Sequence, residues 1–309
     1  MKIFHDIAPL RAALKNAGRV VLVPTMGNLH EGHIALVRDA RKHGDAVVAT
    51  VFVNRLQFRP GEDFDKYPRT LSADAKYLED AGAEFLFAPA EDVMYPTPQY
   101  FYVDVPDELA TILEGEFRPG HFRGVATVVM KLFQIVQPDA ALFGKKDYQQ
   151  MLVLSALVRE FNMPIEVIAG DTIRAADGLA LSSRNGFLSV TERAEAPRLH
   201  RLLMTLVAAV RAGVSDYSAL ESAVMAELKQ NSWAPDYVAI RRRKDLPQAA
   251  FTLPFGILAS ILALGLTIWL LAYVDYKKEG LAILIVAVIG LIIYAAYKFF
   301  GKKTLNEIA

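Results

Sequence analysis

The sequence predicts an α/β protein built around a parallel sheet, with a membrane-spanning tail at its C-terminal end. Over residues 1–172, short apolar runs alternate with amphipathic segments of helical length, which is typical of βαβ units. Polar turns that contain glycine follow several of these runs, at the strand ends where parallel sheets bind ligands. Beyond residue 250 the chain carries two long apolar runs, each able to span a membrane as a helix.

The apolar periodicity predicts the individual elements. We expect strands over residues 20–23, 46–53, 84–88, 140–144 and 165–169. We expect helices over residues 31–43, 72–81, 125–136 and 148–161, two further amphipathic helices over residues 191–212 and 215–230, and a short strand over residues 236–240.

Composition narrows the class of protein. The 309 residues suffice for two domains. The formal net charge is zero, so there is no electrostatic reason to expect a nucleic-acid partner. The absence of cysteine excludes a disulfide scaffold and a thiolate metal site. The first residues carry no long apolar run, and we therefore expect no signal peptide.

The most informative stretch is PTMGNLHEGH at residues 24–33, between an expected strand and an expected helix. His30 and His33 are three residues apart and lie on one face of the first helical turn. Free backbone N–H groups and the helix dipole favour an anion there, and Gly27 and Gly32 let a ligand approach the backbone closely. The pattern suits nucleotide phosphates. A pair of surface histidines, or half of a metal site, is the alternative for this stretch alone.

Other polar stretches lie at strand ends and helix starts. Asn54 and Gln57 follow the second strand and can hydrogen-bond a small polar substrate. The stretches RPGHFRG at residues 118–124 and FGKKDYQQ at residues 143–150 place cations where a helix begins. The stretch LSSRN at residues 181–185 offers two hydroxyls and a guanidinium to a triphosphate. Taken singly, Asn54 and Gln57 are more readily ordinary loop amides, and residues 118–124 are equally well a solvated basic loop. The run at residues 182–185 alone is more often a helix cap or a turn.

In this order, the motifs resemble those of the pantothenate synthetase (pantoate–β-alanine ligase) family. The matching stretches are residues 24–33, 51–58, 118–131, 143–150 and 177–189, within a resemblance that covers residues 1 to about 240. The resemblance implies a Rossmann-like HxGH nucleotidyl-transferase domain over residues 1–172 and a smaller, truncated α+β lid domain over residues 173–242. It also implies a homodimer.

The resemblance implies ATP-dependent condensation of pantoate with β-alanine through a pantoyl-adenylate, with Mg²⁺ taking part and with release of AMP and pyrophosphate. It implies that His33, His30 and Lys146 are catalytic and that Gln57 and Gln150 bind the substrates. The residues implied to bind ATP are Met26, Gly27, Asn28, Leu29, His30, Glu31, Gly32, His33, Gly144, Lys145, Lys146, Asp147, Ile173, Leu181, Ser182, Ser183 and Arg184.

Three residues depart from the pattern of the family. Arg55 stands where proline is usual, Lys145 stands where glutamate is usual, and Ala175 replaces an acidic residue. Together they make the expected site more positive.

Residues 243–309 are expected to form a membrane hairpin, with spans at about 251–274 and 280–299. The first span has no charged residue, and flanking basic residues favour a cytoplasmic position for both ends and for the catalytic domain. This tail is similar to the last two spans of amino acid–polyamine permeases, which suggests a chimera. The alternative function is therefore a fusion with a membrane or transporter fragment whose truncated ligase part is inactive.

Overall fold

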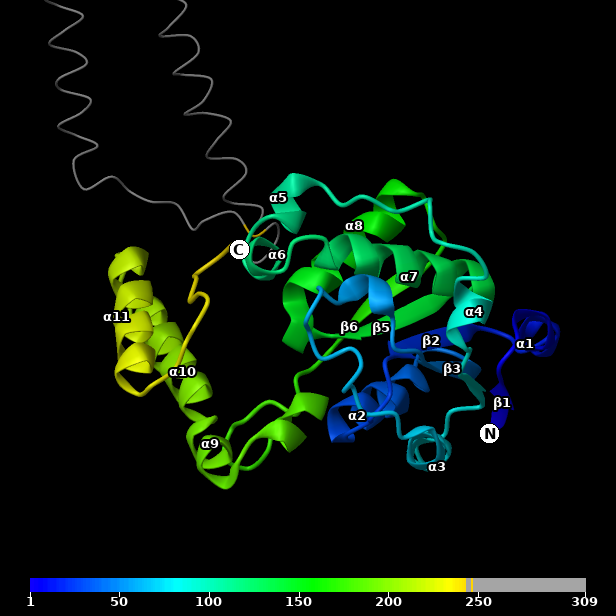
Figure 1. The fold of residues 1–309 in the computed structure, drawn as a ribbon, viewed down its shortest axis with the longest axis horizontal. Helices are drawn as coiled ribbons and strands as arrows, with labels where there is room; N and C mark the ends of the chain where they lie inside the picture. The colour runs from blue at the N-terminus through cyan, green and yellow to red at the C-terminus, as the bar shows by residue number, and fades with distance from the viewer. Residues whose placement is uncertain (243–245, 247–309) are drawn as a thin grey trace, which may run out of the picture. The chain divides into compact units, whose positions relative to one another are not determined.

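A computed structural model of the chain describes residues 1–242 and residue 246, all within one compact unit, Met1–Ala249. Its centre is a six-stranded sheet in the order β1-β4-β3-β2-β5-β6, and every strand pairing is parallel (Figure 1). The predicted α/β fold with a parallel sheet is thus confirmed. The strands are β1 (Lys2–Phe4), β2 (Val20–Thr25), β3 (Ala46–Val51), β4 (Phe85–Phe87), β5 (Ala140–Gly144) and β6 (Glu166–Gly170).

The strand order reverses beside β2. The chain proceeds from β2 through β3 to β4 in one direction and then returns to add β5 and β6 on the other side of β2. The carboxyl ends of β2 and β5 therefore flank the switch point, which is where sheets of this kind bind ligands. β2 and β3 are in register from Val20 opposite Ala46 to Thr25 opposite Val51, so the loops that follow them start side by side.

Helices cover both faces of the sheet, and the central strands are buried accordingly. Figure 1 shows α7 and α8 on one face and α2 and α3 on the other. Leu132 and Leu154 belong to the core of the first face, and Val37 and Leu78 to the core of the second. The helices of this part are α1 (Ile7–Leu14), α2 (Glu31–Ala40), α3 (Leu71–Ala81), α4 (Glu91–Met94), α5 (Asp107–Ala110), α6 (Glu114–Phe117), α7 (His121–Val136) and α8 (Tyr148–Glu160), with the short 3₁₀ turns η1 (Arg55–Gln57) and η2 (Lys145–Asp147).

The predicted strands and helices of residues 1–172 are present, most of them with shifted ends, but β1, α1 and the short helices α4, α5 and α6 were not predicted. β1 is a three-residue edge strand that is largely exposed and leaves no apolar run to detect. The helices α4, α5 and α6 have four residues each, too few to show a helical period. α7 begins at His121 rather than at residue 125, since Gly120 caps it with a positive φ of 81°. Residues 121–124 of the basic stretch therefore belong to the first turn of α7, and residues 118–120 precede it.

The C-terminal segment, residues 173–242, is mainly helical. It contains η3 (Ser183–Phe187), α9 (Val190–Glu195), α10 (Arg198–Arg211) and α11 (Tyr217–Gln230), together with an antiparallel bridge between Arg174 and Ala180. The helix predicted over residues 191–212 is interrupted because Pro197 has no N–H with which to continue α9. The strand predicted over residues 236–240 is not formed. Val238 and Ile240 instead pack on the apolar contact between α10 and α11 around Leu228.

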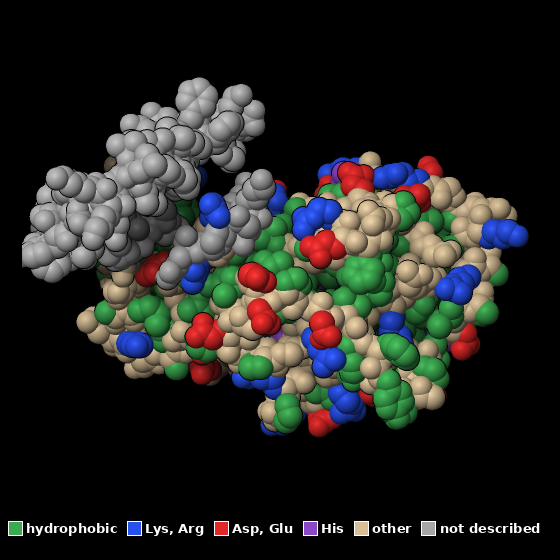
Figure 2. Space-filling model, turned by 90° about the horizontal axis from the view of Figure 1, so that it is seen from above, with side chains coloured by type: hydrophobic (Ala, Val, Ile, Leu, Met, Phe, Trp, Pro, Cys, Tyr) green, Lys and Arg blue, Asp and Glu red, His purple; other side chains and the backbone are tan. Residues whose placement is uncertain are grey.

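The predicted hairpin, with spans at residues 251–274 and 280–299, lies outside the described residues. No helix within residues 1–242 is long and apolar enough to cross a bilayer. On the face seen in Figure 2, Lys and Arg side chains are interspersed with Asp and Glu side chains.

Candidate active site

The HxGH loop after β2 has a backbone shape that only a few residue types tolerate. Gly27 has a φ of +84° and Asn28 a φ of +49°. A Cβ at Gly27 would lie 2.9 Å from Val51 Cγ1, so a side chain there would collide with β3. The buried carboxylate of Asp74 accepts the N–H of Asn28 at 3.0 Å and the N–H of Leu29 at 2.8 Å. α3 therefore holds one side of the loop through Asp74.

The two histidines form the N-terminal cap of α2, and this fixes their tautomers. His30 Nδ1 accepts the N–H of Gly32 at 3.1 Å, and His33 Nδ1 accepts the N–H of His30 at 3.3 Å. A neutral imidazole whose Nδ1 is an acceptor carries its proton on Nε2. Both rings, 4.0 Å apart between centroids, therefore offer an Nε2–H donor.

Burial keeps these imidazoles uncharged. It lowers the pKa of His33 to about 3, with smaller contributions from His30 and from the Lys146 ammonium. Burial also lowers the pKa of His30, and Lys146 adds to that effect. Both rings are half-buried, and the surface that each keeps exposed faces the cavity that they line. Near neutral pH, both rings are hydrogen-bond donors without a net charge.

η1, after β3, holds Gln57 against the start of α7. A Cβ at Gly124 would lie 2.1 Å from the carbonyl oxygen of Leu56, so glycine is required for this close approach. The carbonyl of Gln57 receives hydrogen bonds from His121 Nδ1 at 2.9 Å and from Arg118 at 3.2 Å. The Gln57 side chain lines the cavity, and its Nε2 lies 3.0 Å from Met26 Sδ.

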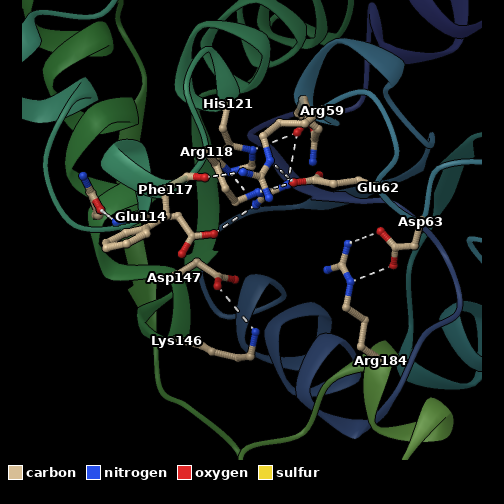
Figure 3. Close-up of polar contacts among 12 residues, drawn as sticks. Arg59, Glu62, Asp63, Glu114, Phe117, Arg118, His121, Lys146, Asp147 and Arg184 are labelled. Carbon is tan, nitrogen blue, oxygen red and sulfur yellow. Dashed lines mark hydrogen bonds and ion pairs between the residues drawn. The ribbon is translucent and has the colours of Figure 1, made fainter. Parts of the chain in front are cut away.

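Arg118 lies between two carboxylates (Figure 3). Its guanidinium donates to Glu62 at 2.8 and 3.0 Å and to Glu114 at 3.0 Å. The hydrogen bond from Arg118 lowers the pKa of Glu62 to about 2, so Glu62 is ionised. His121 is buried beside this pair, and burial lowers its pKa.

Arg184 brings the C-terminal segment onto the loop that follows η1. It donates two hydrogen bonds to Asp63, at 2.8 and 2.9 Å, in the bidentate geometry that guanidinium and carboxylate groups favour (Figure 3). Ser183 Oγ donates to the carbonyl of Asn28 at 2.8 Å, which joins η3 to the HxGH loop as well. Tyr237 stacks on Phe117, with 5.7 Å between ring centroids, and provides a third contact between the C-terminal segment and the rest of the fold.

The loops enclose a cavity of about 380 Å³ at the switch point of the sheet. A smaller adjoining cavity of about 130 Å³ is lined by the ends of β2 and β5 and by residues 171–173. Lys146, the middle residue of η2, lines both cavities, with its Nζ 3.4 Å from Asp147 Oδ1. The predicted residues that line the larger cavity are Met26, His30, His33, Gln57, Lys146, Asp147, Gln150, Ser182, Ser183 and Arg184, and those that line only the smaller one are Gly32, Gly144, Ile173 and Leu181.

Five residues implied to bind ATP line neither cavity. Gly27, Asn28 and Leu29 act through the backbone shape of the HxGH loop described above. Glu31 pairs with Arg38 along the exposed side of α2. Lys145 pairs with Asp171 at 2.6 Å, so the extra positive charge expected there is compensated by a neighbouring carboxylate.

Several residues that line the cavity, or that pair with its arginines, were not assigned a role from the sequence. Tyr67 and Tyr237 line the cavity, although nothing in their local sequence marks them. Glu62 and Asp63 lie in a charged loop whose spacing does not indicate which arginines it meets. Arg118 and His121 did carry a signal, the basic stretch at a helix start, but no substrate role was derived from it.

No group of three or more His, Asp or Glu side chains able to hold a metal ion occurs in the part of the chain that the structure describes. The carboxylates that line the larger cavity are already paired, Glu114 with Arg118 and Asp147 with Lys146. In the loop after η1, Glu62 pairs with Arg118 and Asp63 with Arg184. The residues therefore do not fit a resident metal. A Mg²⁺ ion carried by a nucleotide takes most of its ligands from phosphates and water and needs no such cage.

A family model described as pantoate-beta-alanine ligase matches residues 2–268 of this chain. The pantothenate synthetase of Leptothrix cholodnii is 55% identical over 273 residues, which cover 86% of this chain and 95% of that protein. The pantothenate synthetase of Thiobacillus denitrificans is 54% identical over 249 residues, covering 81% of this chain and 88% of that protein.

Solved structures agree with the sequence relatives. Pantothenate synthetase from Thermus thermophilus superposes with a TM-score of 0.77 at 46% identity and covers 81% of this chain and 90% of its own. The ligase of Francisella tularensis, solved with β-γ ATP and β-alanine, has a TM-score of 0.62 at 34% identity and covers 73% of this chain and 85% of its own.

The family match also corrects the expected end of the resemblance. It reaches residue 268, beyond the limit of about 240 and into the first predicted span. These relatives give no support to the resemblance to permeases or to a chimera.

Proposed function

Because this chain belongs to the pantoate–β-alanine ligase family, we propose that its larger cavity is where pantoate and β-alanine are condensed with the use of ATP. The protein is an ATP-dependent pantoate–β-alanine ligase, and the chain spans almost the whole length of its relatives. The alternative of an inactive ligase fused to a transporter fragment is not favoured, since the match to the Leptothrix cholodnii pantothenate synthetase covers 86% of this chain and 95% of that protein.

One observation carries the assignment of the site. Two uncharged imidazole donors, His30 and His33, face the same cavity as the cations Lys146 and Arg184, although these residues come from three separate parts of the chain. Donors and cations that converge in this way suit a triphosphate, because they stabilise charge that builds up on it in the transition state. Gln57 and Gln150 line the same cavity and suit a small hydroxy acid.

In the proposed first step, a pantoate carboxylate oxygen attacks the α-phosphorus of ATP, the bond to the β-phosphate oxygen breaks, and pyrophosphate leaves. The product is a pantoyl-adenylate, in which the carboxylate has gained a good leaving group. The Nε2–H groups of His30 and His33 would donate to phosphate oxygens, and Lys146 would offset their charge. Mg²⁺ would enter with ATP as part of the substrate, held by phosphate oxygens and water.

In the proposed second step, the neutral amine of β-alanine attacks the carbonyl carbon of the adenylate, AMP leaves, and the nitrogen loses a proton. Positioning supplies much of the rate of such a step. The contacts of Arg184 and Ser183 with residues 1–172 would keep the C-terminal segment over the cavity and water away from the anhydride.

The test is an assay of the purified full chain for AMP and pyrophosphate, with pantoate and β-alanine supplied together and singly. We expect His33→Ala to lose about 10²- to 10³-fold in kcat, as for the loss of one transition-state donor. His43→Ala is the matched control, because His43 lies just beyond the same helix and lines neither cavity. Equal activity of the two variants would remove His33 from the mechanism.

Three further assignments remain proposals. We keep the division into residues 1–172, 173–242 and 243–309 and the homodimer implied by the family resemblance. Membrane attachment through residues 251–274 and 280–299 rests on the apolar sequence of that tail. Light scattering of the purified protein tests the dimer, and recovery in the carbonate-washed membrane fraction tests attachment.

A further inference from the structure

The side-chain amide of Gln57 is oriented by hydrogen bonds that begin outside the cavity. Its Oε1 accepts a hydrogen bond from Asn54 Nδ2 at 3.1 Å. Among the described residues, the only other hydrogen-bond partner of this amide is Met26 Sδ, 3.0 Å from Nε2. Because a thioether is a weak acceptor, a ligand oxygen can replace it. Gln57 is thereby set to present N–H donors, rather than its oxygen, to a ligand.

Asn54 transmits this orientation from a buried position. It is only 1% exposed. Its Nδ2 also donates to the carbonyl of Gly124 at 3.2 Å, and its Oδ1 accepts the N–H of Leu56 at 3.4 Å. The shortest of its contacts is the one with the Tyr95 hydroxyl, which lies 2.7 Å from Oδ1. An amide oxygen only accepts, so Tyr95 is the donor.

Tyr95 is a fixed starting point for the chain of hydrogen bonds. It lies at the C-terminal end of α4, with its ring 6.0 Å from that of Phe52 and with Lys131 Nζ 4.7 Å above its face. Glu91, in the same helix, pairs with Arg55 of η1 and so ties α4 to the turn that carries Gln57. Burial raises the pKa of the Tyr95 phenol, so the hydroxyl keeps its proton near neutral pH.

We propose that Tyr95 is a positioning residue for the hydroxy-acid substrate, acting through Asn54 on the amide of Gln57. The inference rests on the proposed function in one respect, the binding of pantoate by Gln57. Tyr95 itself does not line either cavity. Its hydroxyl is the closer of two donors to Asn54 Oδ1, at 2.7 Å. The other donor, the N–H of Leu56, lies 3.4 Å from the same oxygen.

The decisive variant is Tyr95→Phe, which removes one oxygen and keeps the ring. We expect the KM for pantoate to rise about three- to tenfold, the effect of losing one net hydrogen bond, while the KM for ATP changes less than twofold. Tyr100→Phe is the matched control, because it removes the same oxygen from a tyrosine that is 76% exposed, and it should leave both constants unchanged.

A double-mutant cycle separates positioning from a general loss of stability. If Tyr95 acts through Gln57, the effect of Tyr95→Phe on the KM for pantoate disappears in a Gln57→Ala background. Full additivity of the two changes, or an equal rise in the KM for ATP, overturns the inference.

The cycle also distinguishes the inference from the proposed function. If Gln57→Ala weakens pantoate binding and Tyr95→Phe does not, the proposed site stands and the role of Tyr95 is wrong. If Gln57→Ala leaves the KM for pantoate unchanged, the proposed role of Gln57 fails, and the inference about Tyr95 fails with it.

Discussion

Replacing Gly124 by alanine tests whether the packing of α7 on η1 sets the position of Gln57. The new Cβ would lie 2.1 Å from the carbonyl oxygen of Leu56 and 2.8 Å from the backbone nitrogen of Gln57. Ordinary contact begins at 3.4 Å, so the Leu56 carbonyl and α7 must separate by 1.3 Å, the difference between 3.4 and 2.1 Å. The obstacle is backbone on both sides, and no side-chain rotation relieves it.

We expect two consequences of this shift. Overpacking of this kind costs about 1–3 kcal/mol of the free energy of unfolding, measurable by urea denaturation. A displacement of about 1 Å at a substrate-binding group reduces kcat/KM by about 10²-fold, and the loss should appear in kcat/KM for pantoate. Gly186→Ala is the matched control, because its Cβ would meet nothing within 4 Å and its φ is not positive.

If Gly124→Ala and Gly186→Ala have the same free energy of unfolding and the same kcat/KM for pantoate, the packing of α7 on η1 does not set the position of Gln57. A loss of stability with unchanged kcat/KM for pantoate would show that η1 moves without displacing the Gln57 amide.

Two further perturbations test the electrostatics of the cavity. Because the folded pKa of His33 is about 3 and the unfolded value is about 6.5, only the unfolded chain takes up this proton between those pH values, and stability falls as pH falls through that window. Urea denaturation at about pH 6 and pH 4 measures the free energy of unfolding at each pH. Between them, the wild type should lose about 1.4 kcal/mol more per pH unit than His33→Gln does. Equal losses in the two proteins would contradict the low pKa of His33. Asp63→Asn should lower the KM for ATP about two- to fivefold, because it releases a guanidinium, Arg184, that a partly exposed carboxylate now holds. Asp65→Asn, an exposed residue in the same loop, should leave that KM unchanged, and an unchanged KM in both variants would mean that Asp63 does not compete with ATP.

Local sequence was sufficient where a residue's role depends on its neighbours in the chain. The spacing of His30 and His33 before an amphipathic run predicted a helix start with both rings on one face, and the capping geometry agrees. The apolar runs of β2 and β3 predicted buried parallel strands, because such strands are covered on both faces. By contrast, Pro197 was overlooked within an otherwise periodic helix.

The parallel sheet, the HxGH loop and the residue types at the ends of the strands were therefore predictable from the sequence, since periodicity and turn chemistry act over a few residues. The long-range partners became apparent only in the folded chain: Asp63 for Arg184, Glu62 for Arg118, and Tyr95 for Asn54. Those pairs join residues 41 to 121 positions apart, and contacts at that separation depend on how strands and helices pack. A single sequence carries no local signal of such packing.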